Sequence, residues 1–278
     1  MAGSNERALD LEPQEAKKAD EEEALTADVT YEVIRREGKK ELERSLGALA
    51  WSGLAAGLAM ALTFVAEGLI RAHLPDANWR PLLTKLGYPF GFLVVIMASQ
   101  QLYTENTLLP VVNVLVERTM AVAKKMFSLW GVVLLGNLIG AFIMGWVLAR
   151  TSLVEPDIRG ALRAIALDGM SPGYWSVFLR AIVAGWLIAG LVWMLPASES
   201  AHVTVIFLMT YLVGIGQFSH VIAGSVGAYF LVANGDISLW TATAGFTLPA
   251  LIGNTVGGVT LVAALNHAQV SSGATKSQ

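Results

Sequence analysis

The sequence predicts an all-α integral membrane protein with six transmembrane helices arranged as two inverted three-helix repeats. Three observations support this fold class: apolar segments long enough to cross a bilayer, a short motif that recurs in the third and sixth segments, and polar interruptions of the second and fifth. Composition agrees. Hydrophobic residues make up 54% of the 278 positions and charged residues 15%, against about 25% charged residues in soluble domains.

Charge is distributed unevenly and divides the chain into three parts. Residues 1–44 hold 21 of the 41 charged side chains and are expected to form a cytoplasmic N-terminal region. Within it, residues 1–24 are expected to be disordered. Residues 28–44 are expected to form an amphipathic helix, which either lies on the cytoplasmic membrane face or is solvated without touching lipid. Residues 45–266 form the membrane domain, and residues 267–278 a short cytoplasmic tail.

Six segments are apolar enough to cross a bilayer core of ~30 Å, which needs about 20 residues in helical form. They cover residues 46–70, 86–116, 126–149, 175–195, 203–232 and 239–265. None alternates strictly between apolar and polar positions, so helices are favoured over the strands of a barrel. Their only acidic or basic side chains are Glu67, Glu105, Arg180 and His220.

The distribution of lysine and arginine sets the expected orientation. Residues 1–44 carry eight of them, and the link between the second and third segments adds Arg118, Lys124 and Lys125. The opposite side holds Arg71, Arg80, Lys85, Arg150, Arg159 and Arg163. Because basic residues favour the cytoplasmic side, we expect both termini to lie in the cytoplasm. The expected location of the protein is a bacterial inner membrane. Membrane lipids are its expected surroundings, and the net charge of −3 gives no reason to expect a nucleic-acid partner.

A short motif recurs in the third and sixth segments. GNLIGA occupies residues 136–141 and GNTVGG residues 253–258, each in the last of a group of three segments. Because three is an odd number of crossings, the second group must enter the membrane from the opposite side. Inverted repeats of this kind place the transport site where their broken helices meet. Asn137 and Asn254, within the motif, are expected to support the broken helices first and to touch a solute second.

The first interruption reads QLYTENTLLP, residues 101–110. Glu105 and Asn106 fall where a continuous helix would cross apolar lipid, and Pro110 lacks a backbone donor. A carboxylate at this depth must face water or a partner. The alternative is that Glu105 only caps the second half of the helix or pairs with an arginine.

The second interruption reads GIGQFSHVIAGSVG, residues 214–227. Its four glycines weaken a helix by up to ~1 kcal/mol each relative to alanine, although glycine also serves close helix packing in membranes. Gln217, Ser219 and His220 form a polar cluster between them. Because ionisable groups at membrane depth are rare and usually functional, His220 is interpreted as a functional residue. The alternative is a hydrogen-bonded packing residue.

These stretches together resemble the formate/nitrite transporter family. QLYTEN is similar to that family's first broken loop, GNLIGA and GNTVGG to its paired asparagine motifs, and GQFSHVIAG to the stretch with its central pore histidine. The resemblance covers residues 45–266. It implies an aquaporin-like fold and a homopentamer with one pore in each protomer. It also implies a channel for small monovalent weak-acid anions, such as formate or nitrite, that is proton-linked through the histidine.

The resemblance also implies which residues line the pore. The candidate pore and substrate residues are His220, Thr104, Leu102, Tyr103, Phe218, Ser219, Gln217, Asn137, Asn254 and Glu105. His220 is the central histidine in this mapping. Constriction residues are expected at Phe90 or Leu93 on one side. On the other side they are expected at Gln217 or Phe218.

Several positions depart from the family pattern. They are Gln101 in place of an acidic residue, Glu105 in place of glycine, Ser219 in place of glutamate and Gly224 in place of asparagine. In addition, no lysine lies between Lys125 and Lys276, so the family's vestibule lysine is absent. Arg159 and Arg163 are the candidates to replace it. An ionised Glu105 facing the pore would repel anions, so it must turn away or be paired, or the solute is not an anion.

Other functions are weighed against the same residues. A channel for a small neutral solute would be expected to carry two Asn-Pro-Ala repeats, but residues 195–197 and 248–250 read LPA. A non-conducting scaffold acting through the charged N-terminal region is a third reading. A membrane-embedded hydrolase is disfavoured, because residues 224–227 read GSVG rather than the order a serine nucleophile needs. There is no cysteine and no metal-ligand or nucleotide motif, so we expect no enzyme activity, cofactor or metal.

Overall fold

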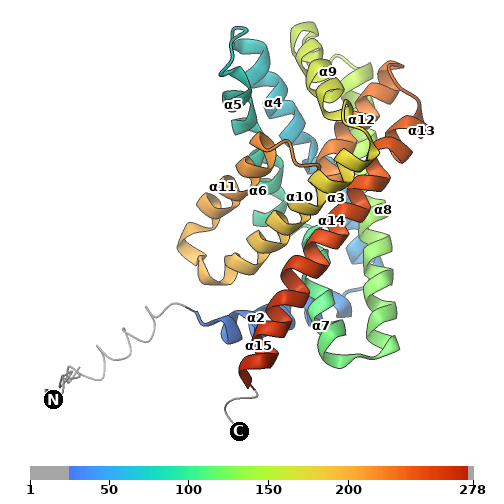
Figure 1. The fold of residues 1–278 in the computed structure, drawn as a ribbon. Helices are drawn as coiled ribbons and strands as arrows, with labels where there is room; N and C mark the ends of the chain where they lie inside the picture. The colour runs from blue at the N-terminus through green and yellow to red at the C-terminus, as the bar shows by residue number, and fades with distance from the viewer. Residues whose placement is uncertain (1–24, 275–278) are drawn as a thin grey trace, which may run out of the picture.

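The computed structural model describes residues 25–274, and within that range the chain contains helices and no strand. Figure 1 shows the helices gathered into one elongated bundle. Four helical segments are long and apolar enough to cross a membrane: Leu46–His73, Met120–Arg150, Tyr174–Ala197 and Leu239–Ser272. Two shorter apolar helices are His202–Ile215 and Val221–Asn234. The prediction of an all-α membrane fold with several spanning helices is therefore confirmed.

The first half of the bundle runs from α3 to α8. Its elements are α3 (Leu46–Ala59), α4 (Ala61–His73), α5 (Arg80–Thr84), η1 (Lys85–Gly87), α6 (Pro89–Met97), η2 (Glu105–Thr107), α7 (Leu109–Glu117) and α8 (Met120–Arg150). Proline stands at the start of both α6 and α7, where its missing N–H is not needed and its fixed φ suits a helix. A proline therefore marks the start of each of the two short helices, α6 and α7.

The second half runs from α10 to α15. Its elements are α10 (Tyr174–Met194), η3 (Leu195–Ala197), η4 (Glu199–Ala201), α11 (His202–Ile215), α12 (Val221–Asn234), α13 (Leu239–Ala242), η5 (Thr243–Thr247), α14 (Leu248–Val256), η6 (Gly257–Ala264) and α15 (Leu265–Ala274). The last apolar stretch contains two π-helical segments, η5 and η6. In Figure 1 this stretch runs through the bundle in the direction opposite to α8.

Helix α9 (Pro156–Met170) was not predicted as an element. It packs against α4 and α12 and lies at the end of the bundle opposite α2 and α15 (Figure 1). Leu162 and Ala166 are buried, while Asp157 and Asp168 are exposed. With one apolar face and one charged face, the helix has too little apolar surface to resemble a membrane crossing, and it covers one end of the bundle.

Helix α2 (Ala27–Glu43) is capped at its N-terminus by Thr26, whose side chain accepts a hydrogen bond from the backbone N–H of Val29. Tyr31 and Ile34 are buried on its inner face, and the helix packs on α7 and α15. Its apolar face therefore meets the rest of the protein, which neither of the two readings of this segment anticipated. The expectation of disorder for residues 1–24 falls outside the described residues.

The two halves share a close approach between their first and last long helices. An added Cβ at Gly57 of α3 would collide with the backbone carbonyl oxygen of Asn137 in α8. An added Cβ at Gly185 of α10 would collide with the carbonyl oxygen of Asn254 in α14. Small residues let membrane helices pack this closely. The same contact in both halves brings each motif asparagine against a glycine of a neighbouring helix.

Candidate functional site

The chain leaves helical geometry between α6 and α7. Helix α6 ends at Met97, and Ser99 then adopts a left-handed backbone with φ of 52°. The backbone N–H of Gln100 donates to the carbonyl oxygen of Val95 at 2.9 Å, which closes the last turn. Residues 101–104 follow without regular structure and are buried. Because a non-glycine residue rarely adopts positive φ, the end of α6 is a specific feature and not fraying.

The same arrangement ends α11 at Ile215. Gln217 has φ of 50°, and the N–H of Phe218 donates to the carbonyl oxygen of Val213 at 3.0 Å. Helix α12 begins at Val221, after three residues without regular structure. The two segments that the sequence singled out as polar interruptions thus have the same local geometry.

Asn137 holds the first of these loops in place. Its Nδ2 donates to the backbone carbonyl oxygens of Gly53 at 2.7 Å and Gln101 at 2.9 Å. Its Oδ1 accepts from the N–H of Tyr103 at 2.9 Å. The side chain is fully buried. A single amide therefore satisfies backbone groups on either side of Leu102 that would otherwise be buried without partners.

Asn254 makes the equivalent three bonds in the second half. Its Nδ2 donates to the carbonyl oxygens of Ala181 at 2.7 Å and Ser219 at 2.9 Å, and its Oδ1 accepts from the N–H of Val221 at 2.8 Å. This side chain is also fully buried. The residue that it brackets is His220, which occupies the place that Leu102 has in the first loop.

His220 connects the two loops. Its Nε2 lies 2.8 Å from Oγ1 of Thr104, which belongs to the other half of the chain. Its Nδ1 accepts from the backbone N–H of Ala223 at 3.2 Å, so the neutral ring carries its proton on Nε2 and donates it to Thr104. The ring of Phe92 meets the imidazole edge to face with centroids 4.9 Å apart. The imidazole is therefore fixed in position and tautomer, and 1% exposed.

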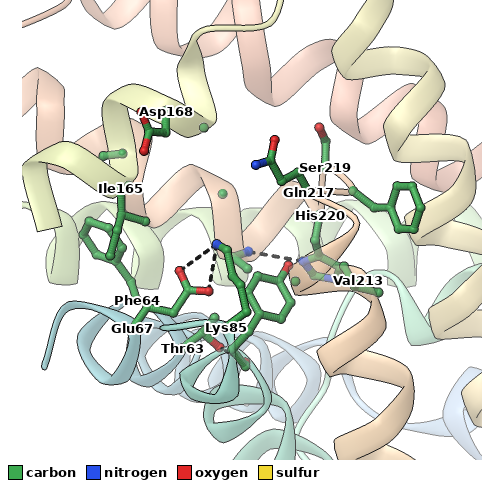
Figure 2. A pocket seen from close by; sticks show the side chains of 18 of the residues that line it. Thr63, Phe64, Glu67, Lys85, Ile165, Asp168, Val213, Gln217, Ser219 and His220 are labelled. Carbon is green, nitrogen blue, oxygen red and sulfur yellow. Dashed lines mark hydrogen bonds and ion pairs between the residues drawn. The ribbon is translucent and has the colours of Figure 1, made fainter. Parts of the chain in front are cut away.

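A cavity of about 200 Å³ leads to this histidine. Of the predicted site residues, His220, Ser219, Phe218 and Gln217 line it. Figure 2 shows His220 and Ser219 on one side, with Glu67 and Lys85 facing them from α4 and η1. The other predicted residues, which are Leu102, Tyr103, Thr104, Asn137, Asn254 and Glu105, do not line it. Leu102, Tyr103 and Thr104 are nevertheless buried, and Thr104 is joined to the cavity through the imidazole.

The cavity contains an ion pair that the sequence analysis did not identify. Nζ of Lys85 lies 2.9 Å from Oε1 and 3.1 Å from Oε2 of Glu67. The side chain of Glu67 is only 4% exposed and that of Lys85 22%. Taking both charges out of water is costly unless they are paired. No local pattern could have linked them, because Glu67 belongs to the first apolar segment and Lys85 to the connection before the second.

The basic residues expected to replace the vestibule lysine are elsewhere. Nη2 of Arg159 donates to the carbonyl oxygen of Thr151. The guanidinium of Arg163 forms a bidentate pair with Asp236, from Nε to Oδ2 and from Nη2 to Oδ1. Neither lines the cavity. The basic side chains that do line it are Arg71, Lys85 and Arg180.

The expected constriction at Phe90 or Leu93 is not at the cavity. Phe90 is 51% exposed, because it lies on the outer side of the short helix α6. Leu93 is partly buried and packs into the apolar core, and neither residue lines the cavity. Phe92, which is fully buried and contacts His220, is the aromatic residue of α6 that meets the site.

Glu105 does not face the cavity that holds His220. Its side chain is partly buried, and its Oε1 has no hydrogen-bond partner among the described residues. Asn106, next to it, donates from Nδ2 to Oε1 of Gln101 at 2.9 Å. Residues 25–274 contain no group of three or more His, Cys, Asp or Glu side chains that could hold a metal ion.

The long apolar helices, the matched loops held by paired amides and the buried polar contact at their meeting point define a multi-pass membrane protein of the helical channel and transporter class. Residues 28–268 match the formate/nitrite transporter family. The chain belongs to this family, which confirms the resemblance drawn from its motifs. The family is one of transporters and not of enzymes.

Relatives and solved structures agree with the family assignment. The chain is 42% identical over 240 residues to inner membrane protein YfdC of Escherichia coli (strain K12), covering 86% of this chain and 77% of the relative. It is 28% identical over 234 residues to the uncharacterized transporter YrhG of Bacillus subtilis (strain 168), covering 81% and 86%.

Two solved structures share the fold. A pentameric formate channel with formate bound matches with a TM-score of 0.63 at 21% identity, covering 83% of this chain and 96% of that one. An FNT family ion channel matches with a TM-score of 0.69 at 20% identity, covering 86% and 96%. At these identities the similarity shows the fold alone.

Proposed function

We propose that the chain is a transmembrane channel for small monovalent weak-acid anions, formate, nitrite or similar, and that its path passes between Thr104 and His220. The observation that carries this proposal is the 2.8 Å contact between Oγ1 of Thr104 and Nε2 of His220. It joins the two helix interruptions in the buried centre of the fold, at the floor of the cavity.

The chemistry of this contact suits a weak acid. A bare anion loses its hydration in an apolar constriction at a large free-energy cost, whereas the neutral acid loses far less. The N–H on Nε2 of His220 can donate to an incoming anion, and the Thr104 hydroxyl can both donate and accept. An imidazole can also exchange a proton with the bound solute. Proton-linked passage through His220 is thus part of the proposal.

The proposal includes six membrane crossings in two inverted repeats, with the second and fifth broken. Four helices are long enough to cross alone, and the pairs α6–α7 and α11–α12 supply the other two. The matched bonds of Asn137 and Asn254 support the repeat. Helices α2 and α15 lie at the same end of the bundle (Figure 1), and the basic residues of the N-terminal region favour the cytoplasm for that end.

The assembly and the location are proposed from the relatives. One structural neighbour is described as a pentameric formate channel, and the relative at 42% identity is described as an inner membrane protein. We infer that this chain also forms a homopentamer in a bacterial inner membrane, surrounded by lipid. Large apolar side chains such as Trp51, Trp175 and Trp240 are more than 70% exposed on the single protomer, as lipid-facing or subunit-facing positions would be.

Flux through purified protein in liposomes tests the proposal. We expect formate, nitrite, acetate, lactate or hydrosulfide, or several of them, to enter protein-containing vesicles faster than empty ones, while glycerol does not. If glycerol alone moved, the channel would be one for neutral solutes. If nothing moved, the protein would be a non-conducting scaffold, and the proposal would be wrong.

A further inference from the structure

We propose that Arg180 is the residue that captures the anion in the cavity, and that its guanidinium makes the channel prefer planar anions with two oxygen atoms. This inference rests on the proposed function. It concerns a side chain that the sequence analysis noted only as a charge within the fourth apolar segment. Arg180 lies in α10, six residues after the first residue of the helix, Tyr174, and lines the same cavity as His220.

The charges around the cavity point to Arg180. Besides His220, five acidic or basic side chains line it, which are Glu67, Arg71, Lys85, Asp168 and Arg180. Lys85 is matched by Glu67 at 2.9 Å, and Arg71 faces Asp168 at 4.0 Å. Among the described residues, Arg180 forms no ion pair. With the imidazole of His220 counted as neutral, the lining carries one positive charge in excess, which favours a monovalent anion.

The donors of Arg180 are only partly used. Its Nη1 lies 3.4 Å from Oε1 of Gln217, a long hydrogen bond to a neutral amide. A guanidinium has five N–H donors, so several remain for a ligand. Gln217 also lines the cavity and lies three residues before His220. An anion bound to Arg180 would therefore be placed at the start of the loop that leads to the imidazole.

The backbone under Arg180 is held firmly. The carbonyl oxygen of the next residue, Ala181, accepts the 2.7 Å bond from Nδ2 of Asn254, and Gly185 packs directly on Asn254 one turn later. The amide that shapes the loop around His220 thus also fixes the part of α10 that carries Arg180. Such preorganisation lowers the ordering cost of binding.

The planar geometry of the guanidinium is the reason to expect a preference for anions with two oxygen atoms. Its planar fork matches two coplanar oxygens with two parallel hydrogen bonds, whereas a lysine ammonium acts as a point charge. Carboxylates and nitrite present two such oxygens. Hydrosulfide presents a single atom and cannot make the bidentate contact. The guanidinium of Arg180 should therefore bind carboxylates and nitrite in preference to hydrosulfide. A positive charge without the planar fork should attract all of these anions alike.

The test uses the full-length protein in liposomes with formate and hydrosulfide as solutes. We expect Arg180→Lys to raise the KM for formate by about tenfold, since one charge-assisted bidentate contact is lost, and to leave hydrosulfide within about twofold, since the charge stays. Arg180→Gln should weaken the transport of both solutes. Arg163→Gln is the matched control, because Arg163 is paired with Asp236 outside the cavity; it should change neither solute.

The outcomes separate this inference from the proposed function. If the wild type conducts and both Arg180 variants transport formate and hydrosulfide as it does, Arg180 has no role in capture and the inference is wrong. Equal losses for both solutes in Arg180→Lys would overturn the preference for two oxygens. A wild type that moves neither solute nor any other weak acid would overturn the proposed function, and this inference with it. Elution volume and thermal unfolding in detergent show whether each variant is folded.

Discussion

Ser99 and Gln217 adopt the same left-handed backbone conformation, with φ of 52° and 50°, at the ends of α6 and α11. Each is followed by a residue whose N–H bonds a carbonyl oxygen five residues earlier. A left-handed residue other than glycine costs about 1–2 kcal/mol. The fold therefore bears the same local cost twice, at the two points where the chain turns out of its helix and into the loops that meet at His220.

This geometry predicts that glycine is preferred over valine at Ser99, which is the opposite of the order inside a helix. A β-branched side chain is especially unfavourable at positive φ, so Ser99→Val should be less stable than Ser99→Gly by about 1–2 kcal/mol. At Ser128, exposed within α8, the order should reverse, because glycine weakens a helix interior. Thermal unfolding of the four variants in detergent measures both differences. The same order at both positions would show that Ser99 is not held in the left-handed conformation.

The paired asparagines should be essential for folding. Asn137→Ala or Asn254→Ala removes three hydrogen bonds and leaves buried backbone groups without partners, at about 1–3 kcal/mol for each group. We expect either variant to lose most of the folded protein. Asn266 is the control, because its Nδ2 makes one bond, to the carbonyl oxygen of Val262 in its own helix. Asn266→Ala should change the unfolding temperature little; an equal effect of all three variants would contradict the bridging role.

The close approach at Gly185 can be tested within one helix. Gly185→Ala places a methyl group against the backbone of Asn254, whereas the space beside Gly190 is open. We expect Gly185→Ala to destabilise the protein by at least about 1–3 kcal/mol, as overpacking does. Gly190→Ala should stabilise it by up to about 1 kcal/mol, because alanine is the better helix former. Unfolding temperatures measure both changes, and a stable Gly185→Ala would exclude the tight contact between α10 and α14.

The Glu67–Lys85 pair should behave as a buried unit. Removing one partner leaves the other charge unpaired in a largely buried place, which costs about 3–5 kcal/mol. The double variant Glu67→Gln/Lys85→Met should therefore lose less stability than the sum of the losses of the two single variants, Glu67→Gln and Lys85→Met. A double-mutant cycle on unfolding measures the coupling. Additive effects would mean that the pair is screened by water.

Much of the site could be predicted because its chemistry is local. His220, Asn137 and Asn254 stand out as polar residues in apolar segments, and the recurrence of the GN-x-x-G motif connects the two halves. The family resemblance placed Thr104 and His220 among the same candidate pore residues, and the structure places them in contact.

The remaining features depend on tertiary packing. Phe92 and Phe90 are equivalent by sequence, and only the way α6 packs decides which meets the imidazole. Helix α9 is too polar to be recognised as a crossing, and it covers the end of the bundle through contacts with α4 and α12. Lys85 and Arg180 come from different segments, so nothing in their sequence neighbourhoods indicates that both line the same cavity.

The most direct test of the central claim is formate flux through His220→Asn in liposomes, compared with the wild type at equal protein content. Asparagine keeps a hydrogen-bonding side chain but cannot exchange a proton as an imidazole does. The account predicts a variant that remains folded and assembled while its formate flux falls at least about a hundredfold, the lower end of what one proton-transfer group contributes. Undiminished flux through a folded His220→Asn protein would contradict it, because the path would then not pass the imidazole.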